Sequence, residues 1–156
     1  MSTSLAEHAK EIIEKILYIT IASVSKDGVP WNSPVYSSHD EEYNFFWASP
    51  YQSQHSRNIK ENDQVFIVIY DSTAAEGTGE GVYIQAKAYE LSDEKEITHA
   101  LKYHYGRKNK EPRPASDFLG SQPLRVYKAV PEKIWTNTYE KIEGRYVDGR
   151  IEISLK

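Results

Sequence analysis

The chain has 156 residues, a formal net charge of -4 and no cysteine. That length corresponds to one domain, residues 1–156. The acidic balance argues against nucleic-acid binding, which needs a basic surface. The lack of cysteine excludes disulfides, thiolate catalysis and thiolate-bound zinc or iron–sulfur clusters. No apolar run approaches the roughly 18 residues of a membrane-spanning helix, and residues 1–10 lack the apolar region of a signal peptide. We therefore expect a cytoplasmic protein.

Tyrosine is unusually frequent, with 12 Tyr against 4 Phe and 3 Trp. A tyrosine ring packs against apolar groups while its hydroxyl stays solvated, so it suits half-buried sheet faces and wet interfaces. The hydrophobic residues make up 39% of the chain. The composition therefore indicates a modest core with amphipathic surfaces around it.

The N-terminal segment has the spacing of an amphipathic helix. Leu5, Ala9, Ile12 and Ile16 fall on one helical face, and Ser4 followed by Glu7 gives a capping box at the start. Two further short helices are expected, one over 52–61 and one capped by Ser92, with an acidic first turn. Between the helices the pattern is that of short strands, which we place at 18–25, 29–38, 43–48, 64–70, 82–91, 124–130, 133–139 and 150–155.

Particular residues indicate how these strands are arranged. Asp-Gly pairs at 27–28 and 148–149 predict tight turns. Pro30 and Pro34 remove ladder donors, which places the strand 29–38 at a sheet edge or against something other than a strand. Residues 64–70 are apolar on both faces and predict a central buried strand. The fold class is therefore mainly β, a small barrel or sandwich of six to eight strands with short α-helices.

The most informative segment for function runs from Ser49 to Arg57, between a strand end and a helix start. Its hydrogen-bond donors are Ser49, Ser53, Gln54, His55, Ser56 and Arg57. Free N–H groups and the positive end of the helix dipole would help them to hold an anion, most simply a phosphate. The alternative is that Ser49 or Ser53 only caps the helix, since serine is an ordinary N-cap residue.

Other chemistry finds less support in the sequence. His99 and His104 are five apart, which does not place them on one helix face, and no metal-binding spacing appears. The glycines of 76–81 precede a strand and lack the following helix and the Lys-Ser/Thr of a P-loop, so this segment is a hairpin loop or one that closes over a ligand. Trp31 and Trp135 lie among polar neighbours and could serve the core or a ligand.

In order along the chain, these features resemble the pyridoxamine 5′-phosphate oxidase-like, FMN-binding split-barrel family. The resemblance runs from about Ile12 to Ile153. It is carried by a Gly-x-Pro turn before WNSPVYSS, an aromatic strand YNFFWAS, the segment SQHSRNIKENDQV, the buried strand VFIVIY, the strand GVYIQAKAYEL and the C-terminal VYKAVPEKIWTN. It implies a split β-barrel that forms a homodimer with two FMN molecules in clefts between the subunits.

The resemblance also implies which residues would bind FMN. The phosphate-binding positions correspond to Ser49, Ser53, Gln54 and His55, with Arg57 close by. Ser33, Pro34, Val35 and Tyr36 correspond to the strand whose backbone lies along the isoalloxazine ring and ribityl chain. The partner chain would contribute Trp135, Asn137 and the strand start at 81–83.

The chain departs from the family pattern at several positions. His55 stands where many members have Lys, and Gln54 where the oxidase itself has Arg. The phosphate charge would then be met by Arg57, a protonated His55 or the helix end. The C-terminal region lacks the Arg-and-His substrate signature of the true oxidase, so the broad FMN-binding subgroup is the better match.

Three functions remain open at this stage. The first is an FMN-dependent oxidoreductase acting on a small molecule, with the cofactor supplying the redox chemistry. The second is a non-enzymatic flavin carrier, store or redox sensor, because no acid, base or substrate signature stands out. The third is a deazaflavin-dependent reductase on the same barrel, because His55 replaces the common Lys. No catalytic residue is assigned, and no metal or nucleic-acid partner is expected.

Overall fold

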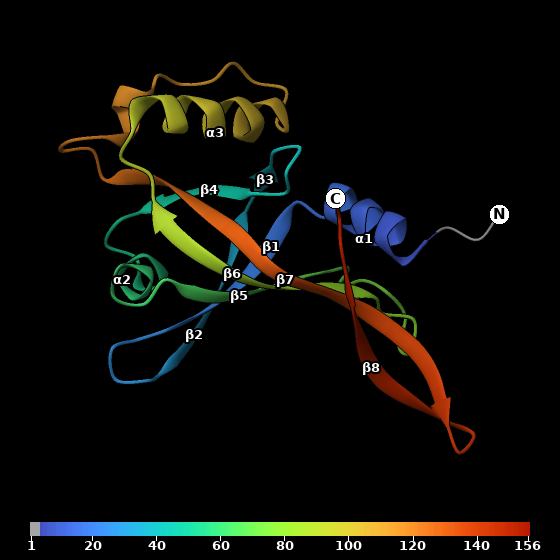
Figure 1. Cartoon of the computed structure of the whole chain (residues 1–156). Coiled ribbons are helices and arrows are strands. Elements are labelled where there is room, and N and C mark those ends of the chain that lie inside the picture. The colour runs from blue at the N-terminus through green and yellow to red at the C-terminus, as the bar shows by residue number, and fades with distance from the viewer. Residues whose placement is uncertain (1–3) are drawn as a thin grey trace.

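Eight strands form one curled antiparallel sheet, whose order is β2-β1-β5-β6-β7-β4-β3 with β8 paired to β7 (Figure 1). The computed structural model describes residues 4–156, apart from the side chains of residues 139, 140, 141, 146 and 148. The strands are β1 (Tyr18–Val24), β2 (Pro30–Tyr36), β3 (Ser38–His39), β4 (Phe45–Pro50), β5 (Gln64–Tyr70), β6 (Gly81–Glu90), β7 (Leu124–Ile142) and β8 (Arg145–Ile153). This architecture confirms the expected split barrel.

The helices within the described residues are α1 (Leu5–Lys15), α2 (Gln54–Glu61), α3 (Glu94–Gly106) and the short 3-10 helix η1 (Ala115–Phe118). The predicted cap of α1 is confirmed, since Ser4 Oγ accepts a hydrogen bond from Glu7 N at 3.2 Å. The acidic first turn of α3 is capped by Asp93 rather than by Ser92, because the Asp93 carboxylate accepts from two first-turn amides. An ionised carboxylate is a stronger acceptor there than a hydroxyl.

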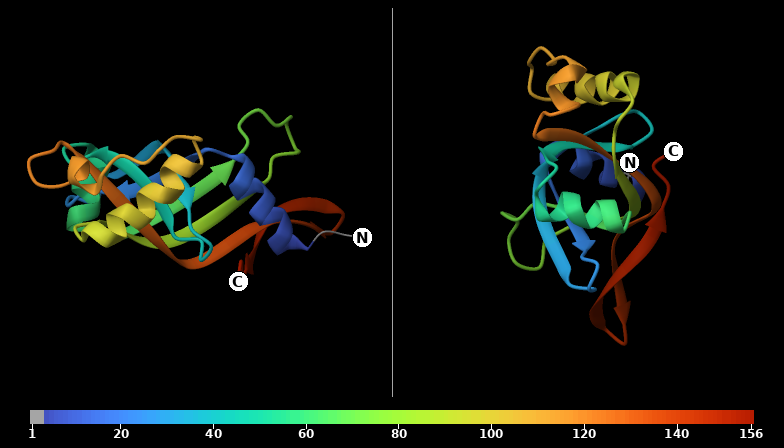
Figure 2. Two further views of the ribbon diagram at one scale, coloured as in Figure 1. Left: turned by 90° about the horizontal axis from the view of Figure 1, so that it is seen from above. Right: turned by 90° about the vertical axis from the view of Figure 1, so that its left-hand side faces the viewer.

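The core has two parts. The larger one fills the barrel, where α1 and α2 pack against inward-facing residues such as Ile21, Ile67 and Ile84. The smaller one joins α3 and η1 to the other face of β4 through Phe46 and Phe118. In Figure 2, α3 (yellow) lies outside the curled sheet, whereas α2 (green) lies across one end of the strands. The two faces of β4 therefore serve different cores.

Two strand predictions are confirmed by the topology. β2, with its two prolines, is the first strand of the sheet and pairs with β1 along one side. Pro30 and Pro34 lack the backbone N–H that would donate to a neighbouring strand, and an edge position tolerates that loss. β5 lies between β1 and β6, as expected of a central strand. Its residues alternate between fully buried and half-buried, so one face lines the core and the other is partly covered.

The C-terminal strands differ from the prediction. The expected strands 124–130 and 133–139 form one continuous strand, β7, because Pro131 falls at a register shift opposite Gln85 and Ala86. The bulge leaves Glu132 outside the ladder while Pro131 stays opposite Ala86, so β7 continues past the proline. The predicted turn at 148–149 is wrong: the chain turns at Glu143 and Gly144, which both have positive φ, and Gly149 lies within β8 opposite Thr138.

Within residues 4–156, no helix combines the length and the apolar character needed to cross a bilayer.

Candidate functional site

The first turn of α2 is capped by Ser53, whose Oγ accepts from Ser56 N at 3.4 Å. The amides of Gln54 and His55 also lie in this turn, where the helix itself offers no acceptor. In the described part of the chain, neither amide has another hydrogen-bond partner. These two N–H groups and the positive end of the helix dipole are the local features that an anion requires.

A serine from β4 meets this helix start. Ser49 is 5% exposed, and its Oγ lies 2.9 Å from Nε2 of His55, which is 9% exposed. The same ring nitrogen lies 3.2 Å from Ser53 Oγ. Two hydroxyls and one imidazole therefore converge at the point where β4 ends and α2 begins. The two hydroxyls can turn a proton toward an incoming acceptor, because hydroxyl hydrogens rotate freely.

Burial disfavours the charged form of the imidazole in this cluster. Burial lowers the pKa of His55 below its ordinary value, because desolvation penalises the charged ring. A protonated His55 was one expected source of positive charge, and its burial disfavours that role. The remaining sources are the helix end and Arg57, whose guanidinium is exposed and donates to Gln54 Oε1 at 2.6 Å. Nε2 of the Gln54 side chain in turn donates to Asn58 Oδ1 at 2.8 Å.

A second layer of polar residues supports α2 from behind, and sequence reasoning missed it. Asn58 Nδ2 donates to Ser23 Oγ of β1 at 3.0 Å, and Ser23 Oγ donates to the carbonyl of Trp31 on β2 at 3.4 Å. Ser23 and Asn58 are almost fully buried. They join two strands to the helix that carries His55. The two residues are 35 apart in sequence, so only the folded chain brings them together.

The predicted strand contacts are placed on β2. Ser33 and Val35 point into the barrel and are buried, and Val35 belongs to the main core. Pro34 lies between them and is exposed. The Val35 side chain is therefore occupied by packing, and this residue can offer a ligand its backbone alone. α2 packs against β1 and β2, so this strand and the helix start belong to one region of the molecule.

Tyr36 ends β2 in an aromatic group. Its ring makes edge contacts with Tyr18 at 5.7 Å and with the buried His104 at 5.4 Å between centroids. The Lys108 ammonium lies 4.9 Å from the Tyr36 centroid and 2.7 Å from His104 Nε2. This set of contacts fixes the orientation of the Tyr36 ring at the end of the edge strand.

Trp135 and Asn137 do not join the Ser49 cluster within one chain. On β7, Arg125 pairs with Ser49, and Trp135 lies ten positions further along, which in an extended strand is about 33 Å. Trp135 stacks on Phe66 with centroids 6.2 Å apart, and Asn137 Oδ1 accepts from Gly81 N at 2.8 Å. The two parts of the predicted site therefore lie at opposite ends of the sheet.

The described fold and this split site can now be compared with known proteins. A family model described as pyridoxamine 5′-phosphate oxidase matches residues 5–137. The chain belongs to the pyridoxamine 5′-phosphate oxidase family. The match covers the β4–α2 cluster, which is Ser49, Ser53 and His55, and it also covers the edge strand β2. It includes Trp135 and Asn137 on β7 and stops before β8. No match was found among curated protein sequences.

Solved structures share the fold of this family member at low sequence identity. A candidate 5-nitroimidazole antibiotic resistance protein from Bacteroides thetaiotaomicron superposes with a TM-score of 0.70 at 13% identity, covering 87% of this chain and 85% of the other. A candidate pyridoxamine 5′-phosphate oxidase from Listeria innocua gives 0.63 at 20% identity, covering 84% and 96%. The heme storage protein HutZ from Vibrio cholerae gives 0.66 at 19% identity, covering 85% and 94%. These likenesses show that the chain shares its fold with the three proteins.

Proposed function

We propose that the chain is an FMN-binding flavoprotein, an oxidoreductase that acts on a small molecule at a flavin shared between two copies of the chain. The observation that carries the proposal is the convergence of Ser49, Ser53 and His55 on the free amides at the start of α2. This convergence lies on the barrel of a family whose members commonly use flavin.

The donor set fits the phosphate of FMN. A phosphate monoester presents several acceptor oxygens, and the cluster offers two backbone amides and the hydroxyls of Ser49 and Ser53, which can turn from His55 toward a ligand. Hydrogen bonds from such donors to a charged group are shorter and stronger than neutral pairs. The positive charge would come from the end of α2 and from Arg57, whose side chain is exposed and can reorient. Ser49, Ser53, Gln54, His55 and Arg57 would hold the phosphate.

The rest of the chain would orient the cofactor. The backbone of Ser33, Pro34 and Val35 runs along the open edge of β2, where no neighbouring strand takes up its hydrogen bonds. Tyr36 would bound the pocket at the end of this edge. When bound, FMN supplies hydride and electron transfer, and the protein supplies binding, orientation and exclusion of water.

A second copy of the chain would complete the site. Trp135 and Asn137 lie too far from Ser49 to reach the same cofactor within one chain, as the spacing on β7 requires. In a two-fold dimer each chain can give its β4–α2 cluster to one cleft and its β7 residues to the other. A homodimer with two cofactors therefore follows from the proposal.

Paired titrations of FMN and riboflavin test the phosphate site. Riboflavin lacks the phosphate, so the difference between the two affinities measures the phosphate contribution alone. We expect Ser49→Ala to weaken FMN and leave riboflavin unchanged, while Ser72→Ala, at an exposed serine in the loop after β5, changes neither. Equal loss for both ligands, or no loss for FMN, would refute the assignment of Ser49.

The same assay separates the alternative ligands. Heme titration tests the ligand of the Vibrio cholerae heme storage protein, whose 19% identity supports the fold alone. Titration with deazaflavin addresses the third sequence hypothesis. We expect FMN to bind more tightly than either. For the oxidoreductase itself, we expect the FMN-loaded protein to oxidise NADPH or to reduce a quinone or nitro compound; binding without any such turnover would favour a carrier or sensor.

A further inference from the structure

The helix α2 packs against the sheet with a mostly polar face. Its four buried residues are His55, Ser56, Asn58 and Ile59, so three of the four are polar. The packed face of a surface helix is ordinarily apolar. Apolar contacts have no preferred direction, whereas a hydrogen bond prefers a particular distance and angle. The orientation of α2 on the sheet therefore depends on directional bonds.

The bonds behind α2 form a chain with a fixed polarity. The Trp31 carbonyl of β2 can only accept, so Ser23 Oγ, 3.4 Å away, donates to it. Ser23 Oγ in turn accepts from Nδ2 of Asn58 at 3.0 Å. The Asn58 amide therefore presents its Oδ1 to the Gln54 side chain, whose Nε2 donates at 2.8 Å. One continuous chain of hydrogen bonds runs from β2 through β1 to the first turn of α2.

Burial makes each link of this chain difficult to replace. Ser23 is 1% exposed and Asn58 is 2% exposed. Removing either side chain leaves a buried donor or acceptor without a partner, which costs more than the loss of an exposed bond. A buried network whose members are all paired favours a single arrangement of the groups that it joins. Ser23 and Asn58 therefore hold α2 in one position on β1 and β2.

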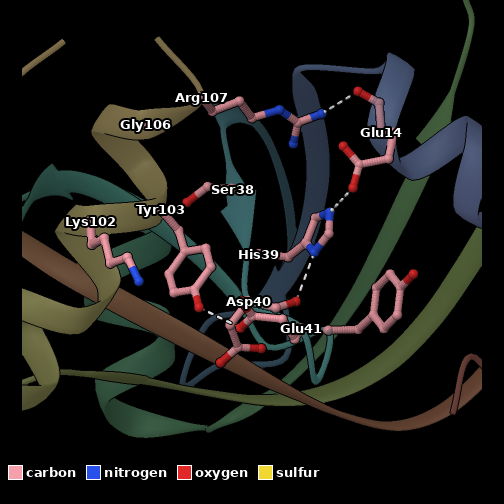
Figure 3. Close-up of a pocket in the computed structure, with 10 residues that line it drawn as sticks. Glu14, Ser38, His39, Asp40, Glu41, Lys102, Tyr103, Gly106 and Arg107 are labelled. Atoms are coloured by element: carbon pink, nitrogen blue, oxygen red, sulfur yellow. Dashed lines mark hydrogen bonds and ion pairs between the residues drawn. The ribbon is translucent and has the colours of Figure 1, made fainter. Parts of the chain in front are cut away.

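The polar contacts around the pocket between α3, β3 and α1 are more exposed (Figure 3). There, Glu14 Oε1 lies 2.9 Å from His39 Nε2, and the Tyr103 hydroxyl donates to Glu41. The Glu14 side chain is 67% exposed, and exposed pairs of this kind contribute little to stability. The buried chain behind α2 is therefore a stronger constraint on the arrangement of its elements than these surface contacts are.

This chain joins the two parts of the candidate flavin site that one protein chain supplies. The free amides of Gln54 and His55 lie in the first turn of α2, and the backbone proposed to follow the flavin ring is that of residues 33–35 on β2. One ligand has to meet both parts. A shift of α2 relative to β2 by about 1 Å would move the phosphate donors away from a ligand that lies on the strand, and displacements of that size weaken a site.

We propose that Asn58 and Ser23 are positioning residues for the phosphate, because they fix the first turn of α2 relative to β2. The inference rests on the proposed function. Both side chains bond to protein groups behind the helix, so they act on the ligand through the placement of the Gln54 and His55 amides. Their loss changes the recognition of the phosphate rather than that of the flavin ring.

Titration of FMN and riboflavin against three variants tests this role. We expect Asn58→Ala and Ser23→Ala each to raise the dissociation constant of FMN about tenfold and to leave that of riboflavin within about twofold, since the bonds at stake are those to a charged group. The control is Asn62→Ala at the other end of the same helix, where Asn62 Oδ1 accepts from Gln64 N. This variant should leave both dissociation constants unchanged.

The ratio of the riboflavin and FMN dissociation constants separates positioning from simple stabilisation. A variant that is only less stable loses both ligands together, and thermal melting gives the folded fraction in each titration. Ser23→Ala keeps the test available if Asn58→Ala does not fold. The inference is overturned if Ser49→Ala lowers the ratio while Asn58→Ala and Ser23→Ala keep the wild-type value. If the wild type binds both ligands equally, or neither, the proposed phosphate site fails and the positioning role fails with it.

Discussion

His55 Nε2 lies 2.9 Å from Ser49 Oγ, which ties the first turn of α2 to the end of β4. The contact brings a buried imidazole and a buried hydroxyl to the helix end where two amides have no acceptor. Simple capping needs only the hydroxyl of Ser53. The additional polar groups of Ser49 and His55 are not needed for capping, and they are the reason for proposing an anion site here.

The phosphate site predicts the effect of removing its polar and charged groups together. His55→Ala combined with Arg57→Ala should weaken FMN by roughly 1–3 kcal/mol, the scale of hydrogen bonds to a charged group. Lys60→Ala, which removes an exposed cation from the last turn of the same helix, should leave the affinity unchanged. Flavin fluorescence titration measures the FMN affinity of the wild type, the double variant and Lys60→Ala. Unchanged affinity in the double variant would mean that the segment is only a capped helix.

A shared cleft predicts complementation between two defective chains. Ser49→Ala and Trp135→Ala damage opposite halves of each site, so each variant alone should bind FMN weakly. In a randomly mixed population about a quarter of the sites would combine Ser49 of one chain with Trp135 of the other, by the two-fold symmetry of the dimer. Mixing the unfolded variants and refolding them should therefore recover about a quarter of the tight FMN sites. No recovery would contradict a site built from two chains.

The buried His104 predicts a loss of stability in acid. Burial, together with the nearby charge of Lys108, lowers the pKa of His104 to about 4 from an ordinary 6.5. Between these two values the unfolded chain binds a proton that the folded chain does not, so the free energy of unfolding falls as the pH drops from about 6.5 to about 4. The loss is on the order of 2–3 kcal/mol.

Urea denaturation at pH 7.5 and pH 5 measures that loss. His104→Gln cannot take up the proton and should show a smaller difference between the two pH values than the wild type. Lys95→Gln, which changes an exposed side chain on the same helix, should keep the wild-type difference. An equal pH dependence in the wild type and His104→Gln would contradict the role of His104.

The end of α1 depends on a residue distant in sequence. Arg107 NH2 donates to the carbonyls of Ile13, Glu14 and Ile16 at 2.9, 2.7 and 3.1 Å. These carbonyls have no helical donor, and a cation at a helix C-terminus also complements the dipole. Arg107→Ala should lower the free energy of unfolding by about 2–3 kcal/mol. Arg113→Ala, which breaks an exposed pair with Asp117, should cost under about 1 kcal/mol.

The parts of the fold that sequence predicts well are those fixed by local pattern. The α1 stripe with its Ser4 cap, the edge position of β2 and the central position of β5 all follow from neighbouring residues. The two strands expected over 124–130 and 133–139 form one strand, β7, because a bulge at Glu132 lets β7 continue along β6. The Asp-Gly pair at 148–149 has a turn composition, but its pairing with β7 keeps it inside β8.

In the candidate functional site, too, the sequence predicts only the contacts between residues that are close along the chain. Ser49, Ser53 and His55 are close in sequence and were predicted together, since the strand end and the helix start are adjacent. Ser23 and Asn58 were missed because their contact depends on how α2 packs against β1. The lowered pKa of His55 also follows from burial in the fold, which no local pattern shows.

The absorption spectrum of the purified protein, with mass analysis of any ligand released on denaturation, tests the flavin proposal most directly. We expect the oxidised flavin bands, released FMN, and saturable uptake of added FMN by protein that has lost it. A colourless protein that takes up no FMN, or one that releases heme instead, would contradict the proposal.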